Sequence, residues 1–517
     1  MDENARTARR DRRRGRDGAS GHSAMERSPD YRQLRNSFMP QRVVSDDEIS
    51  SIHETAFQVL EDLGIKVLLP EARAYFASAG ALVDDATQMV RIGRDIVQSA
   101  LDSAPRRFVG KAGNPGRDLE FELGSMMFLA GSGAPNVTDL DRGRRAGSLA
   151  DFEDLTRIVQ SFDVLHLQGP YVEAQDIDLR LRHYAVGKVQ LTMSDKMPFV
   201  YARGTGQVEE SFEMIKLARG MDEAAFEADP HCYTVINTNS PRQLDIPMAR
   251  GIIDFARYRQ ISIITPFCLA GAMAPITVAG ALTLQHAEAL AGITLAQIVR
   301  RGAPVVYGSF SSNVDMKSGA PAFGTPEHVK ATLGAGQLAR HLGLPWRSGA
   351  GSASNVNDSQ AAHETQFALW GSVLAGATIC IHAAGWLEGG LSVSFEKIIT
   401  DLEALQTFAE LFAPTSGGAA EIGYDAIADV QPGGHFFSTP HTMERYRTAF
   451  YPPLVADLAN FGNWSEAGAK TANQRANAIW KRTVEEYRPI DRADEIAAVL
   501  DAYIARGTAA GGAEPES

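Results

Sequence analysis

The chain has 517 residues, of which 44% are hydrophobic and 22% are charged, and its formal net charge at pH 7 is −13. This size and composition are ordinary for a globular protein and allow one large barrel with additions, or two to three smaller domains. The acidic balance argues against a nucleic-acid enzyme, because phosphate binding requires a basic face.

The first 30 residues are rich in arginine and nearly free of apolar side chains, which predicts a disordered basic tail over residues 1–30. No apolar segment follows the adjacent arginines, so a secretory signal is not predicted. Residues 261–284 carry no charge, but prolines and glycines interrupt them, and a buried strand followed by a buried helix explains them better than a membrane span. With three well-separated cysteines and no CxxC pair, we expect a soluble, cytoplasmic protein.

The predicted elements begin with an N-terminal α/β extension over residues 31–125. It opens on a capped amphipathic helix at Ser45 and continues with helices and short strands. At the other end, residues 413–505 form a C-terminal segment that we expect near the mouth of the central domain. Residues 506–517 are rich in Gly and Ala and are expected to be a disordered tail.

Between these additions, short apolar runs that end in Gly-, Ser- or Asn-rich loops alternate with stretches of helical length. Two helical stretches open on an N-cap residue, Ser148 and Thr325. Apolar strands separated by helices predict a parallel sheet, and eight repeats predict an α/β fold of the (β/α)8 TIM-barrel type over residues 126–412. No glycine-rich phosphate fingerprint supports a doubly wound sheet instead. The eight runs are 126–131, 164–171, 197–204, 232–239, 261–271, 303–312, 345–351 and 378–386.

Aromatic residues are frequent where these runs end, which is where barrel enzymes keep their chemistry. A ring of aromatic side chains suits a quaternary ammonium group, which each ring attracts by roughly 0.5–2 kcal/mol when desolvated. For several of the rings, the alternative that they face the surrounding helices stays open. The better candidates are Phe310, Trp346 and Trp386, with Tyr171 also at the mouth, whereas Tyr201, Phe267 and Tyr307 are those for which the alternative is stronger.

The stretch GSASNVNDSQAAHETQ, residues 351–366, follows the seventh run. Its small, uncharged start leaves room for a ligand at the barrel mouth. Asp358 lies where the next helix begins, so it either caps that helix or contacts a ligand. His363 and Glu364 follow one to two turns into the same helix.

Three other functions are alternatives to an ammonium site. Cys380 and His382 could face a zinc ion, but a catalytic zinc site needs about three protein ligands. A barrel lyase or hydrolase could use His382 and Glu388 as acid and base. A betaine-binding sensor without catalysis is the third alternative.

Five stretches in order resemble the trimethylamine methyltransferase family, and the resemblance extends from about residue 31 to about residue 490. No single stretch is diagnostic, but their order on a predicted (β/α)8 barrel is specific, and the family has a barrel fold. The stretches are IHETAFQVLEDLGIKV, SGAPNVTDLDRGRRAGSLADF, ASNVNDSQAAHET, HAAGWLEGGLSVSFEKIITDLE and PGGHFFSTPHTMERYR.

The resemblance implies transfer of a methyl group from an amine to the cobalt of a corrinoid (cobalamin) carried by a separate partner protein, with no tightly bound metal in this chain. Archaeal trimethylamine enzymes carry pyrrolysine near the loop after the seventh strand. This sequence has none, and the region reads Ser354, Asn355, Val356 and Asn357. Members without pyrrolysine resemble demethylases of quaternary amines, so glycine betaine is the expected substrate and other betaines come next. A homo-oligomer is expected from base rates alone.

A betaine would also need donors for its carboxylate, and the resemblance suggests further contacts. Glu388 would balance the ammonium or meet the corrinoid, and His435 and His441 would face the corrinoid. The candidate carboxylate donors, in order of preference, are Arg347, His363, Asn313 and Arg203.

Overall fold

The computed structural model describes residues 29–516, so residues 1–28 of the basic tail predicted over 1–30 lie outside the described residues. The N-terminal extension contains a small sheet in which β2 (Ile65–Val67) pairs with β4 (Met89–Arg91), and β4 with β3 (Leu82–Asp84). Three helices belong to it: α2 (Asp46–Gln58), α3 (Pro70–Ser78) and α4 (Arg94–Ser103). Ser45 caps α2 through a capping box with Glu48, as its sequence predicts.

The central sheet has seven strands in the order β1-β7-β18-β17-β14-β12-β10. β1 (Leu34–Arg35) is antiparallel to β7, and every other neighbouring pair is parallel. The fold is therefore mixed α/β around a parallel sheet; the closed eight-stranded barrel stays a prediction. The parallel strands are β7 (Ser125–Phe128), β10 (Tyr233–Ile236), β12 (Ile261–Ile264), β14 (Val305–Gly308), β17 (Trp346–Gly349) and β18 (Ile379–Ile381).

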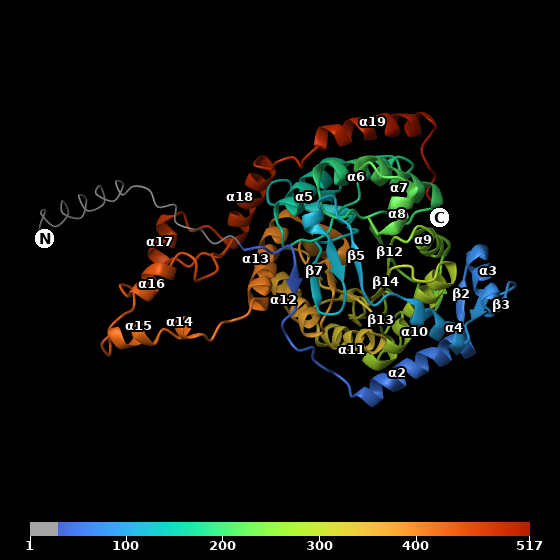
Figure 1. The fold of residues 1–517 in the computed structure, drawn as a ribbon, viewed down its shortest axis with the longest axis horizontal. Helices are drawn as coiled ribbons and strands as arrows, with labels where there is room; N and C mark the ends of the chain where they lie inside the picture. Colours follow the sequence, from blue (N-terminus) through green and yellow to red (C-terminus); the bar gives the residue numbers. More distant parts are fainter. Residues whose placement is uncertain (1–28, 517) are drawn as a thin grey trace, which may run out of the picture. The chain divides into compact units, whose positions relative to one another are not determined.

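Helices that alternate with these strands surround the sheet, and Figure 1 shows them around the central strands. One helix lies between each strand or apolar run and the next. The helix returns the chain to the same end of the sheet, and the successive strands are therefore parallel. The helices are α5 (Leu149–Ser161), α6 (Arg182–Met193), α7 (Thr205–Arg219), α9 (Ile246–Arg257), α10 (Val278–Val299), α11 (Pro326–Leu342), α12 (Ser359–Leu374) and α13 (Phe395–Phe412).

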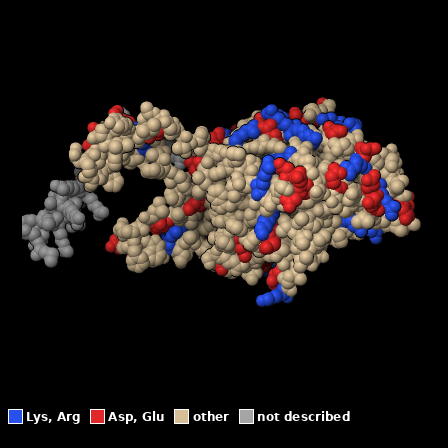
Figure 2. Space-filling model, turned by 90° about the horizontal axis from the view of Figure 1, so that it is seen from below, with Lys and Arg blue, Asp and Glu red and all other residues tan. Residues whose placement is uncertain are grey.

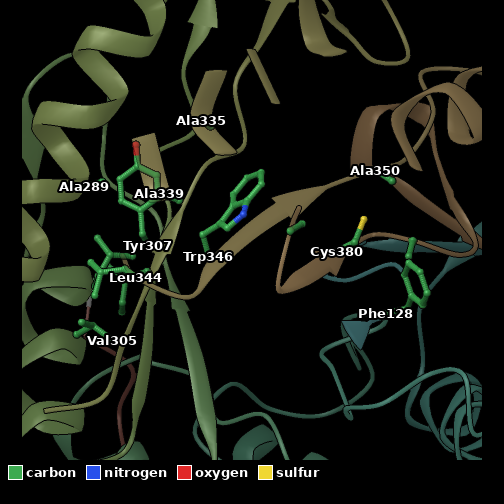
Figure 3. Packing of buried hydrophobic residues seen from close by; sticks show 14 of the residues in the cluster. Phe128, Ala289, Val305, Tyr307, Ala335, Ala339, Leu344, Trp346, Ala350 and Cys380 are labelled. Carbon is green, nitrogen blue, oxygen red and sulfur yellow. The ribbon is translucent and has the colours of Figure 1, made fainter. Parts of the chain in front are cut away.

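The strands bury both faces. Outward-facing side chains pack on the helices: Figure 3 shows Tyr307 and Trp346 among Ala289 of α10 and Ala335 and Ala339 of α11. The side chains at the positions between these point to the opposite face of the sheet, where they form a separate apolar cluster. Leu119 and Phe121 of β6 (Leu119–Phe121) join this inner cluster, whose other members include Met127, Leu129, Leu167, Phe199, Tyr233, Ile261, Ile263, Val306, Ile379 and Ile381.

The uncharged segment 261–284 consists of β12, the two-residue strand β13 (Leu269–Ala270) and the start of α10. α10 is buried on nearly all sides because α2, α4, α9 and α11 pack around it. Within residues 29–516, no helix combines the length and apolarity that a membrane crossing requires. On the face drawn in Figure 2, acidic and basic side chains are interspersed.

The C-terminal region belongs to two units. Thr415–Pro452 is part of a compact unit of its own, with the short helices α14 (Ala419–Ile422), α15 (Tyr424–Asp429) and α16 (Pro440–Arg445). Pro453–Ser517 belongs to the main unit. There α18 (Ala472–Glu485) packs on α13 and α5, and α19 (Ala493–Ala509) packs on α6 and α7 (Figure 1).

The expected disorder from residue 506 is wrong for the part that the structure describes. α19 continues to Ala509, since alanine favours the helix and the run has no proline. Beyond the helix, the backbone N–H of Ala513 donates to the Arg180 carbonyl at 3.2 Å, and that of Glu516 to the Arg203 carbonyl at 3.0 Å.

Candidate functional site

An aromatic cluster lies where several strands of the sheet end, and we call it the aromatic cage. Phe310 is at its centre, with ring centroids 5.3 Å from Phe267, 5.2 Å from Phe323 and 5.1 Å from His382. Trp386 stacks on His382 at 4.4 Å and meets Phe323 edge-on at 5.1 Å. These are the separations of favourable aromatic pairs. The chain therefore builds the cage from segments after β12, β14, β16 (Pro321–Ala322) and β18 and from β19 (Trp386–Leu387).

Glycines after β17 make room for this cage. A Cβ atom on Gly349 would lie 2.5 Å from the Phe310 ring, and one on Gly351 would lie 2.1 Å from the Trp386 ring. Gly351 also has φ +119°, a conformation that other residues rarely adopt. The small residues after the seventh run therefore admit aromatic rings from neighbouring loops.

Arg347 lies against the cage and is itself buried. Its guanidinium carbon is 4.7 Å from the Phe310 ring centroid, and its side chain is only 2% exposed. Within the described part of the chain, neither Nε nor Nη1 has a hydrogen-bond partner. Burial lowers the pKa of Arg347 to about 9, so the group is still cationic at neutral pH. A buried cation without a partner is costly, which points to an anionic ligand.

The neighbours of Arg347 across the sheet are set by the register of three strands. Arg347 pairs with Gly308 of β14, and the next strand places Thr265 beside Gly308. A Cβ on Gly308 would lie 2.0 Å from Thr265 Oγ1, so only glycine allows the hydroxyl to approach the backbone this closely. Thr265 Oγ1 is buried and, like Tyr201 Oη, lacks a hydrogen-bond partner within residues 29–516. Buried polar atoms are nearly always satisfied, so these atoms add hydrogen-bonding capacity inside the sheet.

His382 is neutral in this setting. Burial and, next, the charge of Arg347 hold the pKa of His382 well below its ordinary value. Its Nδ1 accepts a hydrogen bond from the Ser132 backbone N–H at 3.3 Å, and its ring supports Trp386. His382 therefore fits a positioning role for the cage.

Comparison with known proteins identifies the family. The family model for trimethylamine methyltransferase matches residues 8–512. A glycine betaine methyltransferase of Desulfitobacterium hafniense (strain Y51) is 33% identical over 466 residues, which cover 90% of this chain and 96% of that protein. A trimethylamine methyltransferase of the same species (strain DSM 10664 / DCB-2) is 30% identical over 462 residues, covering 89% of this chain and 92% of that protein.

This chain belongs to the trimethylamine methyltransferase family. The resemblance of its sequence is thereby confirmed. Among solved structures, the monomethylamine methyltransferase of Methanosarcina barkeri aligns with a TM-score of 0.43 and 11% identity, covering 87% of this chain and 96% of that one.

For this family member, two of the predicted aromatic residues lie away from the cage. Trp346 points outward from β17, is fully buried, and its Nε1 donates to the Gly376 carbonyl at 2.8 Å. Its neighbour Arg347 takes the inward position because adjacent strand residues face opposite sides. Tyr171 is also in the core, where its hydroxyl donates to Gln168 Oε1 at 2.7 Å. Both residues are structural in this fold.

Two predicted charged residues already have partners. Arg203 Nη2 lies 2.7 Å from Glu173 Oε1. Arg144 Nε donates to both carboxylate oxygens of Glu388, at 2.9 and 3.0 Å. Each charge is paired within the chain, so neither side chain is available for an ion pair with a betaine.

Asn313 and His363 are likewise outside the cage. Asn313 Oδ1 accepts from the Thr325 hydroxyl at 2.9 Å, and its amide nitrogen donates to the Val314 carbonyl at 3.1 Å. His363 is exposed on α12 and stacks on Phe367 at 5.9 Å.

The loop after β17 is held by Glu364, one residue beyond His363. Its Oε2 accepts from Ser352 Oγ at 2.6 Å and from the backbone N–H groups of Ala353 and Ser354 at 2.8 and 3.2 Å. Asp358 caps α12 by accepting from the Ala361 N–H at 3.0 Å. Of the two predicted roles for Asp358, helix cap or ligand contact, the structure therefore shows the helix cap.

Residues 354–357 do not line the cage as a group. Ser354 is buried and its hydroxyl donates to the Val356 carbonyl at 3.0 Å, whereas Asn355 and Val356 are exposed. Asn357 and Asn473 are joined by two hydrogen bonds, of 2.6 and 2.8 Å, which connect this loop to α18.

His435 and His441 belong to the unit that contains Thr415–Pro452. The His435 ring is 5.5 Å from that of Phe437, and His441 Nε2 is 3.2 Å from the Ala420 carbonyl oxygen. Contact of either residue with a corrinoid stays a prediction.

Sequence reasoning missed two members of the cage and one polar neighbour. The sequence favours a helix-facing position for Phe267, and it gives no prediction for Phe323 or Thr265. Phe267 and Thr265 lie in the fifth run, whose alternation from Ile261 and Ile263 is a signal for an inward Thr265. Phe323 lies 13 residues beyond Phe310, in a short hairpin strand that periodicity does not reveal.

Proposed function

We propose that this protein transfers a methyl group from a quaternary amine, with glycine betaine as the first candidate, to the Co(I) corrinoid of a partner protein. The product is the tertiary amine. The names of two relatives, a glycine betaine and a trimethylamine methyltransferase, support methyl transfer from an amine. The observation that carries the choice of a betaine is the unpaired Arg347 against an aromatic cage.

A betaine has the two groups that this arrangement accommodates. Its trimethylammonium group is attracted to the faces of the cage rings, and its carboxylate supplies the anion that Arg347 lacks. Arg347 lies only 4.7 Å from the Phe310 centroid, so the two charges of the ligand must be close together. This favours glycine betaine or proline betaine over carnitine, whose charges are farther apart.

The chemistry needs little acid–base help. The C–N electron pair returns to nitrogen as the methyl carbon bonds to cobalt through the electron pair of Co(I), and the amine leaves neutral. No proton moves, which agrees with a neutral His382 and with the absence of a free carboxylate at Glu388. The residues of this chain bind, orient and exclude water, and orientation alone contributes several kcal/mol to such transfers.

We also propose that the strands close into the (β/α)8 barrel. Support comes from the two runs that the seven-stranded sheet leaves out. Single parallel bridges join Phe199 to Tyr233 of β10 and Leu167 to Met197, and the His166 N–H donates to the Phe128 carbonyl of β7 at 2.9 Å. These contacts run from β10, at one edge of the sheet, to β7, the last of the parallel strands.

The test is to incubate the purified protein with chemically reduced cob(I)alamin and one amine at a time, following the Co(I) absorbance. The panel contains glycine betaine, proline betaine, carnitine, choline and trimethylamine. We expect Co(I) to be consumed with glycine betaine, with methylcobalamin and dimethylglycine appearing together. Choline has no carboxylate and should react at least tenfold more slowly. Persistence of Co(I) across the panel, with betaine binding by calorimetry, would replace this proposal with a sensor function.

A further inference from the structure

The segment Thr415–Pro452, which we call the arm, is unusually apolar on its surface. Eight of its described large apolar side chains are between 44% and 82% exposed. Five of the eight are aromatic. They are Ile422, Tyr424, Ile427, Phe436, Phe437, Met443, Tyr446 and Phe450.

This exposure reaches the upper end of what the free surface of a monomer carries. A buried aromatic side chain contributes about 150–250 Å², so the five aromatic rings alone expose on the order of 600 Å². The largest apolar patch of a typical monomer is roughly 300–600 Å² in total. A stable protein–protein interface needs about 800 Å² from each partner, which the arm nearly supplies. A segment this short also cannot bury such side chains in a core of its own.

The main unit carries a groove between α12 and α13 whose lining mixes apolar with polar side chains. The groove has a volume of about 200 Å³, and its lining includes Trp370, Thr407, Phe408 and Leu411. Trp370 is 37% exposed and Leu411 46%, and Phe367 on the same helix as Trp370 is 41% exposed.

Both ends of the arm are attached at α13. The chain leaves α13 at Phe412, and where it re-enters the main unit the Glu403 carboxylate of α13 accepts from the backbone N–H groups of Val455 and Ala456. Glu403 also lines the groove. The roots of the arm and the groove are therefore next to each other in the main unit.

We propose that the arm of one copy packs into the α12–α13 groove of a second copy, and reciprocally. A second copy is favoured over an unrelated partner because each chain carries both the apolar arm and the exposed apolar side chains of α12 and α13 in and beside the groove. A two-fold exchange covers both surfaces of both copies, which is the closed arrangement that most homo-oligomers use. A different partner protein would cover only one of them.

The first measurement is sedimentation equilibrium of the full chain at tens of micromolar. We expect a dimer, or a larger even-numbered assembly. The double variant Phe437→Ser with Phe450→Ser should halve the mass with an unchanged circular dichroism spectrum. The control Leu82→Ser removes a 70% exposed side chain on β3 and should leave the mass unchanged. A monomeric wild type, or a double variant with unchanged mass, overturns the proposal.

A second measurement separates exchange between copies from packing within one copy. The three native cysteines are buried and free, so an added surface cysteine reacts selectively. One preparation carries Thr407→Cys in the groove and the other Ser438→Cys in the arm; both positions are exposed. After the two are mixed and equilibrated, a short bismaleimide should link one chain of each kind. Absence of this product, with an intramolecular link in the chain that carries both cysteines, shows packing within one copy and overturns the proposal.

Discussion

At the scale of single residues, Arg347 is the side chain whose burial the fold alone does not explain. It is surrounded by Phe310, Gly308 and Gly349, and it gains no ion pair within the described chain. Burying a lone cation costs several kcal/mol, and replacing buried charge with apolar groups often stabilises a protein. A residue that costs stability and contacts the candidate site is expected to be retained for binding.

Arg347→Met therefore should have opposite effects on stability and activity. We expect the free energy of unfolding to rise by about 1–4 kcal/mol, measured by urea denaturation. We expect kcat/KM for glycine betaine to fall at least about 30-fold, because an interaction with a buried charge is worth roughly 2–5 kcal/mol.

The matched control for this prediction is Arg203→Met. Glu173 keeps a second partner, Arg182, at 2.9 Å, so the loss of Arg203 leaves no isolated carboxylate. We expect kcat/KM within about threefold of the wild type. Equal losses of activity in the Arg203 and Arg347 variants would contradict the assignment of Arg347 as the carboxylate partner.

A second prediction at this scale concerns pH and His53. His53 Nδ1 lies 2.9 Å from His286 Nε2, and His286 Nδ1 lies 3.0 Å from the Tyr307 hydroxyl. Gln285 donates to that hydroxyl, so Tyr307 donates to His286, and His286 donates to His53. This series of hydrogen bonds can form only when both histidines are neutral. Burial and, next, His341 lower the pKa of His53 to about 4, with Glu54 opposing and Arg94 adding to the shift.

Because the folded pKa lies below the unfolded value of about 6.5, the unfolded state binds more protons between these values. Stability from this group is complete above pH 6.5 and is lost as the pH falls to about 4, by on the order of 2–3 kcal/mol. We expect His53→Gln to flatten the dependence of the unfolding free energy on pH in this window, measured by urea titrations at pH 4.5 and 7. An unchanged slope would show that other histidines account for the acid sensitivity.

At the scale of elements, the loop after β17 depends on the helix that follows it. Glu364 on α12 binds three groups of residues 352–354, and the neighbouring Gly351 lies against Trp386. Glu364→Ala removes these charge-assisted hydrogen bonds and frees the loop beneath the cage. We expect KM for the amine to rise about tenfold or more, because small displacements of an oriented substrate are costly.

The control at the same helix is Asp358→Ala. It removes the N-cap and one contact with the Ser354 hydroxyl at 3.2 Å but keeps the three hydrogen bonds to Glu364, so it should lower the free energy of unfolding by about 1 kcal/mol with a smaller rise in KM than Glu364→Ala. Steady-state kinetics and urea denaturation of both variants separate the two roles. A Glu364 variant that loses stability but keeps its KM would contradict a link between the loop and the cage.

Which features of the fold and the site the sequence predicts also depends on how the elements pair. The apolar runs located the parallel strands, because period and turn residues are local properties. The inward or outward direction of each residue is not local: Trp346 and Arg347 are adjacent, and only the register with β14 and β18 puts Arg347 inside. The partners of Arg203 and Glu388 come from segments 30 and 244 residues away, so the sequence alone does not reveal that these charges are paired. Phe323 reaches the cage on a hairpin with no periodic signal.

At the scale of the whole molecule, the main unit consists of two stretches of chain that the arm connects. Residues 31–414 supply the sheet, and the stretch from 453 supplies α18 and α19. Trp480 of α18 packs 4.7 Å from Phe395 and donates to Glu396 Oε1 at 3.0 Å. α19 adds Leu500 to an apolar cluster with α6 and α7. The contacts between the stretches are therefore apolar and extensive, and none of those named involves the arm.

This organisation predicts that the arm is dispensable for folding of the main unit. Fragments 1–417 and 453–517, expressed together, should copurify as a 1:1 complex that binds glycine betaine by calorimetry. Trp480→Ala in the shorter fragment should weaken the complex by about 3–5 kcal/mol, the usual cost of deleting a buried tryptophan. Light scattering should show one copy of each fragment, because the arm that joins two copies is missing. Recovery of the longer fragment alone, folded and without the shorter one, would contradict this view of the main unit as a single core built from both ends of the chain.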